Sequence, residues 1–280
     1  MQAEPQVALR IRDAIAEAAR RLSAVSDTPR LDAELLMAHA LGIERDWLLL
    51  SDRDGPAPAA FGPLIARREA GEPVAYILGR RAFWTIELEV GPAVLIPRPD
   101  SETLVEAALA HFGVDGPRTV LDLGTGSGAL LLAALDQWPS ARGVGVDRSP
   151  DALEVARRNA ERLGLAGRTE FRLGDWGEAL AGTFDLILCN PPYVEEAADL
   201  PRTVADWEPH QALFAGPDGL DAYRRLAPQV GRLLAPEGIA CFEIGAGQEA
   251  SAGALFEAAG LSVSSRRDLG GHVRCLVVRH

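Results

Sequence analysis

The hydrophobic and polar positions of the chain change their spacing near Thr119. Beyond this point, short apolar runs alternate with longer amphipathic segments. Such runs are typical of buried strands, and the amphipathic segments between them are typical of helices that cover a sheet. The pattern therefore predicts a doubly wound α/β domain with a mostly parallel sheet, whose ligands bind beyond the carboxyl ends of the strands. The predicted strands read TVLDL, RGVGVD, TEFRLGD, FDLILCN, GIACFEIG, LSVSS and RCLVVRH.

The amino-terminal part shows helical spacing. Apolar residues of segment 7–22 repeat on one helical face, and segment 28–42 begins with Thr-Pro and ends with glycine. The run WLLL at 47–50 is expected to lie in the core of this part. We predict a small all-α domain over residues 1–75.

Residues 76–100 change character again. The stretch FWTIELEV alternates between apolar and polar residues, and a Gly-Pro pair follows it, which together indicate a β-hairpin linker. The α/β domain then comprises residues 101–280. Its first residue, Ser101, is in a position to cap the first helix.

Composition and charge argue against several classes of protein. The 280 residues carry a formal net charge of -12, all 28 cations are arginine, and no basic stripe is present, which argues against a nucleic-acid-binding protein. No apolar run reaches the roughly 18 residues of a membrane span, and the amino terminus lacks the apolar region of a signal peptide. We expect a cytoplasmic protein that does not bind membranes. The scattered histidines have no ligand spacing, so no metal site is predicted, and the three cysteines are expected in the core.

A glycine-rich turn connects the first strand of the α/β domain to the helix that follows. Glycines let the backbone pass close to a ligand, and the helix amino terminus directs its amides at that ligand. The turn indicates a nucleotide-type cofactor site. Its residues are Gly124, Thr125, Gly126, Ser127 and Gly128.

Three positions outside the turn help to identify the cofactor. Asp147 ends the second strand, where a carboxylate can accept both hydroxyls of a ribose. The same pattern serves NAD, so a dehydrogenase is an alternative. Asp122 precedes the glycines, where it can accept from an amino group, and this favours S-adenosylmethionine, which carries no pyrophosphate. Trp176 follows the third strand and offers a stacking face for adenine, unless it is a structural core residue.

The fourth strand runs directly into Asn190, Pro191, Pro192 and Tyr193. Two consecutive prolines end the sheet pairing and leave carbonyl oxygens facing the cleft. The Asn190 side-chain oxygen and the Pro191 backbone oxygen can accept both N–H groups of a planar amide, and Tyr193 can pack against its plane. An amide nitrogen is a poor nucleophile, so placing it close to a methyl donor supplies most of the rate.

With these motifs, the chain resembles the HemK/PrmC-type N5-glutamine methyltransferases. The resemblance covers nearly the whole sequence. It includes the stretches EPVAYILGRRAFW, VLIPRPDSETLVE, LDLGTGSGA, GVDRSPDAL, GDW, NPPY, EPHQALFAGPDGLDAYRRL and EIGAGQ. The family commonly has threonine where this chain has Ser101, which keeps the hydroxyl group.

The resemblance implies a class I S-adenosylmethionine-dependent methyltransferase, Rossmann-like, with a seven-stranded mostly parallel sheet. It implies that the glycine turn, Asp147, Trp176 and Asn190 bind S-adenosylmethionine, which becomes S-adenosylhomocysteine. The segment 190–193 would bind the glutamine of the Gly-Gly-Gln motif in class 1 release factors. The helical domain would help to recognise the release factor, and we expect a monomer.

Three alternatives stay open. A ribosomal protein glutamine methyltransferase has the same active site, and an adenine-N6 nucleic-acid methyltransferase shares NPPY but fits the acidic chain poorly. A non-catalytic S-adenosylmethionine-binding module would have little need for an intact NPPY.

Overall fold

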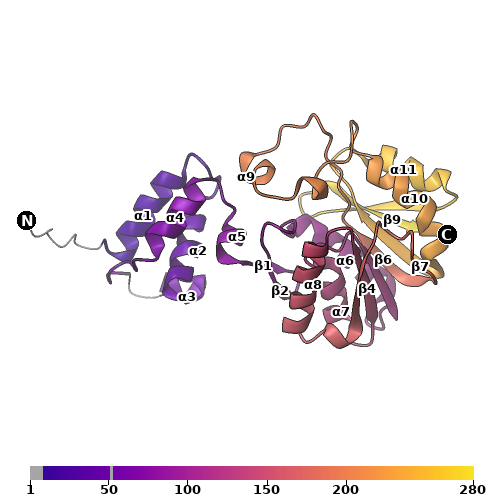
Figure 1. The fold of residues 1–280 in the computed structure, drawn as a ribbon, viewed down its shortest axis with the longest axis horizontal. Helices are drawn as coiled ribbons and strands as arrows, with labels where there is room; N and C mark the ends of the chain where they lie inside the picture. Colours follow the sequence, from indigo (N-terminus) through magenta and orange to yellow (C-terminus); the bar gives the residue numbers. More distant parts are fainter. Residues whose placement is uncertain (1–8, 51–52) are drawn as a thin grey trace, which may run out of the picture. The chain divides into compact units, whose positions relative to one another are not determined.

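The computed structural model describes residues 9–50 and 53–280, and its chain divides into two compact units (Figure 1). The first unit comprises the chain up to Gly79 together with Leu200–Trp207. The second comprises Arg80–Asp199 and Glu208–His280. The expected three-part division at residues 75 and 100 stays a prediction, and each unit is described by itself.

The first unit is helical, as expected. Ile15, Leu22 and Leu36 are fully buried in its core. Gly42 ends the second helix in the left-handed conformation, with φ of 68°. Residues 1–8 and 51–52, on which part of the helical prediction falls, lie outside the described residues. The helices are α1 (Ile11–Leu22), α2 (Pro29–Leu41), α3 (Arg45–Leu50), α4 (Phe61–Glu69), α5 (Val74–Leu78) and α9 (Arg202–Ala205).

The run WLLL at 47–50 is a correction to the sequence-based expectation. Only Leu48 is buried, whereas the exposed fractions of Trp47 and Leu50 are 67% and 82%. The reason is that α3 is a short helix of six residues, and only one side of so short a helix can face the core.

The second unit contains the predicted seven-stranded sheet, with strand order β5-β4-β3-β6-β7-β9-β8. The first five of these strands pair in parallel, and β9 pairs antiparallel with both β7 and β8. The chain runs outward from β3 in one direction and from β6 in the other, so ligands should bind beyond these two strands. The strands are β3 (Thr119–Leu123), β4 (Arg142–Asp147), β5 (Thr169–Leu173), β6 (Phe184–Cys189), β7 (Leu234–Glu243), β8 (Ser262–Arg267) and β9 (Val273–Arg279).

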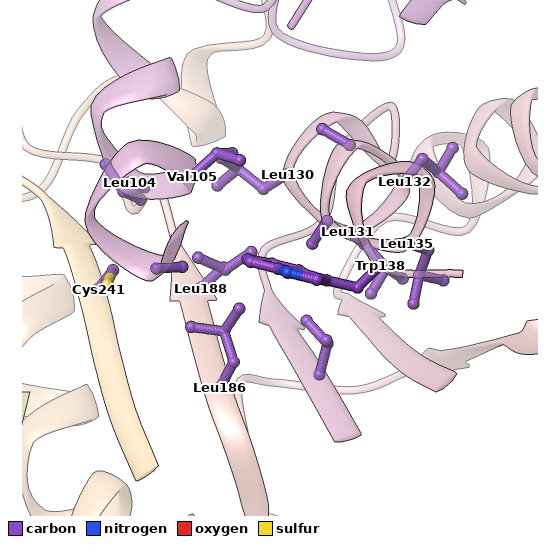
Figure 2. Packing of buried hydrophobic residues seen from close by; sticks show 14 of the residues in the cluster. Leu104, Val105, Leu130, Leu131, Leu132, Leu135, Trp138, Leu186, Leu188 and Cys241 are labelled. Carbon is purple, nitrogen blue, oxygen red and sulfur yellow. The ribbon is translucent and has the colours of Figure 1, made fainter. Parts of the chain in front are cut away.

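Both faces of the sheet are buried. Side chains of β6 alternate between two hydrophobic clusters, with Leu186 and Leu188 in one and Ile187 and Cys189 in the other. Figure 2 shows the first cluster, where Leu186 and Leu188 meet the leucines of α7 and Trp138. All three cysteines are buried, as predicted, and none forms a disulfide. The main helices of this unit are α6 (Glu102–Phe112), α7 (Ala129–Gln137), α8 (Pro150–Arg162), α10 (Asp221–Leu233) and α11 (Glu249–Ala258).

The predicted hairpin is present, but it turns at Trp84 and Thr85, inside the stretch FWTIELEV, and not at the expected Gly91-Pro92 pair, because Phe83 pairs with Ile86. The hairpin consists of β1 (Arg80–Phe83) and β2 (Ile86–Glu89), which pair antiparallel. Asn159 of α8 fixes it to the sheet unit. The backbone N–H of Glu89 donates to Asn159 Oδ1 at 2.6 Å, and Asn159 Nδ2 donates to the carbonyls of Glu89 and Ser127 at 3.0 and 2.9 Å. One buried amide thus joins the hairpin, α8 and the glycine turn.

Candidate active site

A cavity of about 280 Å³ lies beyond the carboxyl ends of β3, β4, β5 and β6, where the strand order predicts a ligand. Most of the predicted site residues line it. Gly128, Pro191 and Tyr193 are not among its lining residues. Those that line it are Gly124, Thr125, Gly126, Ser127, Asp147, Trp176, Asn190 and Pro192.

The glycine turn follows β3 and begins α7. The N–H groups of Gly124 and Thr125 both donate to the carbonyl of Val146 at 2.9 Å, which ties the turn to the end of β4. Gly128 has φ of 85°, and a Cβ atom there would lie 2.9 Å from Leu132 Cδ1. Glycine is therefore required where the turn enters α7.

Asp122 is almost fully buried at the end of β3 and lines the cavity. Its Oδ2 accepts from the Thr125 hydroxyl at 2.6 Å and from the Leu131 N–H at 3.3 Å. Its Oδ1 has no hydrogen-bond partner among the described residues. Burial is the largest cause that raises the pKa of Asp122 to about 7, and the two hydrogen bonds oppose it. The site therefore holds a carboxyl oxygen available to a donor, preferably a cationic one.

Asp147 ends β4 and also faces the cavity. Its Oδ2 accepts from the Gly126 N–H and its Oδ1 from the Ser149 N–H, both at 2.9 Å. Burial raises the pKa of this carboxyl, and hydrogen bonds from the backbone counteract the rise. A carboxylate has more acceptor capacity than these two bonds use, so hydroxyl groups of a ligand can also be bound.

Trp176 lies beside the glycine turn in a left-handed conformation, with φ of 53°. A Cβ atom on Gly124 would lie 3.2 Å from its ring, so the glycine allows the ring to come close. The preceding residue, Asp175, accepts from Arg225 of α10 at 2.5 Å. Both Trp176 and Asp175 line the cavity.

The segment 190–193 follows β6. The Asn190 amide nitrogen donates to the Ser101 hydroxyl at 3.0 Å, while its Oδ1 receives no hydrogen bond from the part of the chain that the structure describes. The Tyr193 hydroxyl donates to Glu243 Oε1 at 3.1 Å, and burial raises the pKa of that phenol. Asn190 thus lines the cavity with its amide held on one side.

Ser101 corrects the expectation of a helix cap. Its side chain makes no capping bond with α6. Instead its hydroxyl donates to Glu243 Oε2 and accepts from Asn190. The sequence analysis assigned no role to Glu243, a buried residue at the end of β7. A charged residue that ends a strand in an otherwise apolar run was the available signal.

The sequence analysis also missed Glu208, which fixes the stretch IPRP. Its Oε2 accepts from the Ile96 N–H at 3.0 Å, and its Oε1 pairs with Arg98 at 2.5 Å. Glu208 is buried, and Pro97 of the same stretch lines the cavity. The carboxylate therefore holds one wall of the cavity in place.

Residues 9–50 and 53–280 contain neither a metal-binding cluster nor a membrane-spanning helix. No three His, Cys, Asp or Glu side chains are grouped so that they could hold a metal ion. No helix among these residues is both long and apolar enough to cross a membrane.

Comparison with known families matches both parts of the chain. Residues 13–79 match the PrmC N-terminal domain, and residues 116–254 match a methyltransferase domain. Among solved structures, a methyltransferase from Pyrococcus furiosus superposes with a TM-score of 0.53 at 21% identity, covering 76% of this chain and 95% of that one. A ribosomal protein L11 methylase from Lactobacillus delbrueckii gives 0.52 at 20% identity, covering 69% and 84%. The fold is therefore that of the class I methyltransferases.

Two curated relatives are much more similar in sequence. A release factor glutamine methyltransferase of Rhodospirillum rubrum is 49% identical, covering 90% of this chain and 79% of the relative. One of Cereibacter sphaeroides is 45% identical, covering 97% and 99%. The chain belongs to the family of release factor glutamine methyltransferases.

Proposed function

We propose that this enzyme transfers a methyl group from S-adenosylmethionine to the side-chain nitrogen N5 of the glutamine in the Gly-Gly-Gln motif of class 1 release factors. The observation that carries the proposal is the position of Asn190 at the cavity, with its amide nitrogen engaged by Ser101 and its oxygen available. The names of the curated relatives support the same substrate. We further propose that the enzyme acts as a cytoplasmic monomer and that its helical unit contributes to recognition of the release factor.

The residues around the cavity fit S-adenosylmethionine. The free oxygen of Asp122 suits a cationic amino group, Asp147 suits the ribose hydroxyls, and Trp176 suits the adenine. A Cβ atom on Gly126 would meet no atom within 4 Å, so the turn leaves open space beside these groups. When bound, S-adenosylmethionine supplies an electrophilic methyl carbon, which the glutamine nitrogen takes with loss of one proton, leaving S-adenosylhomocysteine.

The chain's own contribution is to bind and orient the glutamine. Asn190 Oδ1 and the Pro191 carbonyl accept the two N–H groups of the substrate amide, and the Tyr193 ring packs against its plane. This arrangement fixes the nitrogen at the reacting distance of roughly 3 to 3.5 Å. The substrate nitrogen becomes acidic once it is methylated, so no strong base is needed before transfer.

The variant Asn190→Ala tests the assignment. We expect its kcat to fall by about 10²-fold to 10³-fold, the usual effect of losing one preorganised polar group at a reacting centre. Cofactor affinity, measured by calorimetry, should be reduced but measurable. A variant that retains the wild-type kcat would contradict the role of Asn190.

The substrate is tested by incubating the wild-type enzyme with labelled S-adenosylmethionine and, separately, a release factor, a ribosomal protein and DNA. Label should appear on the release factor and be lost when its Gly-Gly-Gln glutamine is replaced by glutamate. Label on the ribosomal protein or the DNA alone would overturn the proposal.

A further inference from the structure

Ser101 determines which way the Asn190 amide faces. A serine hydroxyl has one proton, and in this structure Ser101 donates it to Glu243 Oε2. The Ser101 oxygen can therefore only accept from Asn190, whose Nδ2 lies 3.0 Å away. An amide that turns its nitrogen toward Ser101 must turn its oxygen the other way.

The Glu243 carboxylate accepts hydrogen bonds from two residues of the site, Ser101 and Tyr193. Its second oxygen accepts from the Tyr193 hydroxyl at 3.1 Å. One carboxylate is therefore hydrogen-bonded both to Ser101, which contacts Asn190, and to Tyr193. Glu243 is 1% exposed, which makes alternative water partners scarce. Glu243 is not among the residues that line the cavity, so it acts through Ser101 and Tyr193.

We infer that Ser101 and Glu243 are positioning residues for the methyl transfer. The ionised Glu243 accepts a hydrogen bond from the Ser101 hydroxyl, so that the Ser101 oxygen accepts from Asn190 Nδ2 and Asn190 Oδ1 is presented to the substrate amide. This inference rests on the proposed function and adds to it the groups that set the amide orientation.

In the structure Asn190 donates to Ser101, and Ser101 donates to Glu243. Protonation of Glu243 would reverse the direction of both hydrogen bonds. A protonated carboxyl can donate to the Ser101 oxygen, which frees the Ser101 hydroxyl to donate to Asn190 Oδ1. The Asn190 amide would then present its NH₂ group to the NH₂ group of the substrate, and two donors cannot bond to each other. Transfer therefore requires the ionised form of Glu243.

The surroundings of Glu243 place its titration in an accessible range. Burial is the largest cause that raises its pKa to about 7, the hydrogen bonds from Ser101 and Tyr193 lower it, Asp100 raises it and Arg274 lowers it. Cys189, Cys275 and Tyr223 also lie within electrostatic range of Glu243. We expect kcat to fall as the pH drops below about 7.

The first test compares Ser101→Ala with Ser101→Thr on a full-length release factor. Alanine removes the acceptor, so kcat should fall by about 10-fold to 100-fold, the scale of a misplaced reacting group. Threonine keeps the hydroxyl and should stay within about threefold of wild type. Equal kcat for wild type and Ser101→Ala, or equal losses for alanine and threonine, would overturn the inference.

Tyr223→Phe is the matched structural control. Its hydroxyl donates to the backbone carbonyl of Glu243 at 2.8 Å, so the variant loses a buried hydrogen bond to the same residue without touching the carboxylate. It should be measurably destabilised in urea and keep the wild-type kcat. If Tyr223→Phe lowers kcat as much as Ser101→Ala does, the effect is structural and the inference fails.

The pH profile of kcat, at saturating S-adenosylmethionine, provides a readout that a structural role would not move. Glu243→Gln cannot titrate, so its profile should lose the acid limb that wild type shows below about 7. Asp122 titrates in the same range, but the limb should persist in Asp122→Asn. Ser101→Ala removes the hydroxyl that connects Glu243 to Asn190. The residual kcat of this variant should therefore also show no fall below about pH 7. A limb that survives in both Glu243→Gln and Ser101→Ala would overturn the inference.

The proposed function and the inference fail in different ways. A wild-type enzyme that does not methylate the release factor refutes the function. A wild-type enzyme that does, together with a fully active and folded Ser101→Ala variant, refutes only the positioning role.

Discussion

Asp122 is a carboxyl group whose burial disfavours its charged form. Its folded-state pKa of about 7 lies above the ordinary value of 3.8, mainly because of desolvation. Between these two values the folded protein binds a proton that the unfolded chain has released. Stability from this group is therefore complete below about pH 4 and decreases as the pH rises through 7. A bound cation at Oδ1 would compensate for the loss.

This leads to a prediction for Asp122→Asn in the ligand-free protein. The free energy of unfolding of wild type should fall by about 2 to 3 kcal/mol between pH 5 and pH 8 because of Asp122 alone. The variant cannot titrate there and should lack that part of the fall, while its affinity for S-adenosylmethionine should be weaker. Urea unfolding at both pH values, with calorimetry, gives the comparison. The same pH dependence in both proteins would contradict the prediction.

Residues within a short motif could be predicted, and residues joined only by the fold could not. The glycine turn and Asn190 were found because the strand, the turn and the chemistry are contiguous in the sequence. Ser101 and Glu243 are 142 positions apart and meet only when β7 is placed beside β6. A serine before a helix predicts a cap, in which its oxygen accepts from a backbone N–H. In the structure that oxygen accepts from the Asn190 amide instead, and the hydroxyl donates to the buried Glu243 carboxylate, which is a strong charge-assisted acceptor.

At the scale of elements, Asn159 shows how a helix can hold both a hairpin and a ligand-binding turn. Its buried amide makes three hydrogen bonds to backbone groups of β2 and the turn. The periodicity of the sequence predicted the strands of the sheet, most of the helices and the presence of a hairpin, but not α5, α9 or the position of the hairpin turn. It could not predict that a polar residue of α8 would bond to the hairpin, because polar residues of amphipathic helices usually face solvent.

We expect Asn159→Ala to lower the free energy of unfolding by about 2 to 4 kcal/mol, because the loss leaves a part-buried N–H and two carbonyls without their partner. The neighbouring variant Arg158→Ala is the control. Its ion pair with Glu89 is solvent-exposed, so its removal should cost less than about 1 kcal/mol. Urea unfolding of the two variants decides the matter, and equal losses would contradict the assigned role of Asn159.

At the scale of the whole molecule, all the cavity-lining residues belong to the sheet unit. A ligand stabilises the structure to which it binds, by about 2.7 kcal/mol at a concentration 100 times its Kd. Stabilisation by S-adenosylmethionine should therefore be concentrated in that unit.

Hydrogen exchange measured by mass spectrometry tests this expectation. With cofactor at 100 times its Kd, amides of β3 and β6 that exchange by unfolding of the sheet unit should slow by about 100-fold. Amides of α1 and α2 should change little. Asp122→Asn at the same cofactor concentration should show smaller protection. Equal slowing in α1, α2 and the sheet would mean that the two units unfold as one.

The segment Leu200–Trp207 belongs to the helical unit although it follows six strands of the sequence. A ribosome releases the chain from its amino terminus, at about 5 to 20 residues per second. The last helix of the helical unit, α9, is therefore synthesised several seconds after Gly79. During synthesis, this amino-terminal unit is finished only after most of the central strands have already emerged.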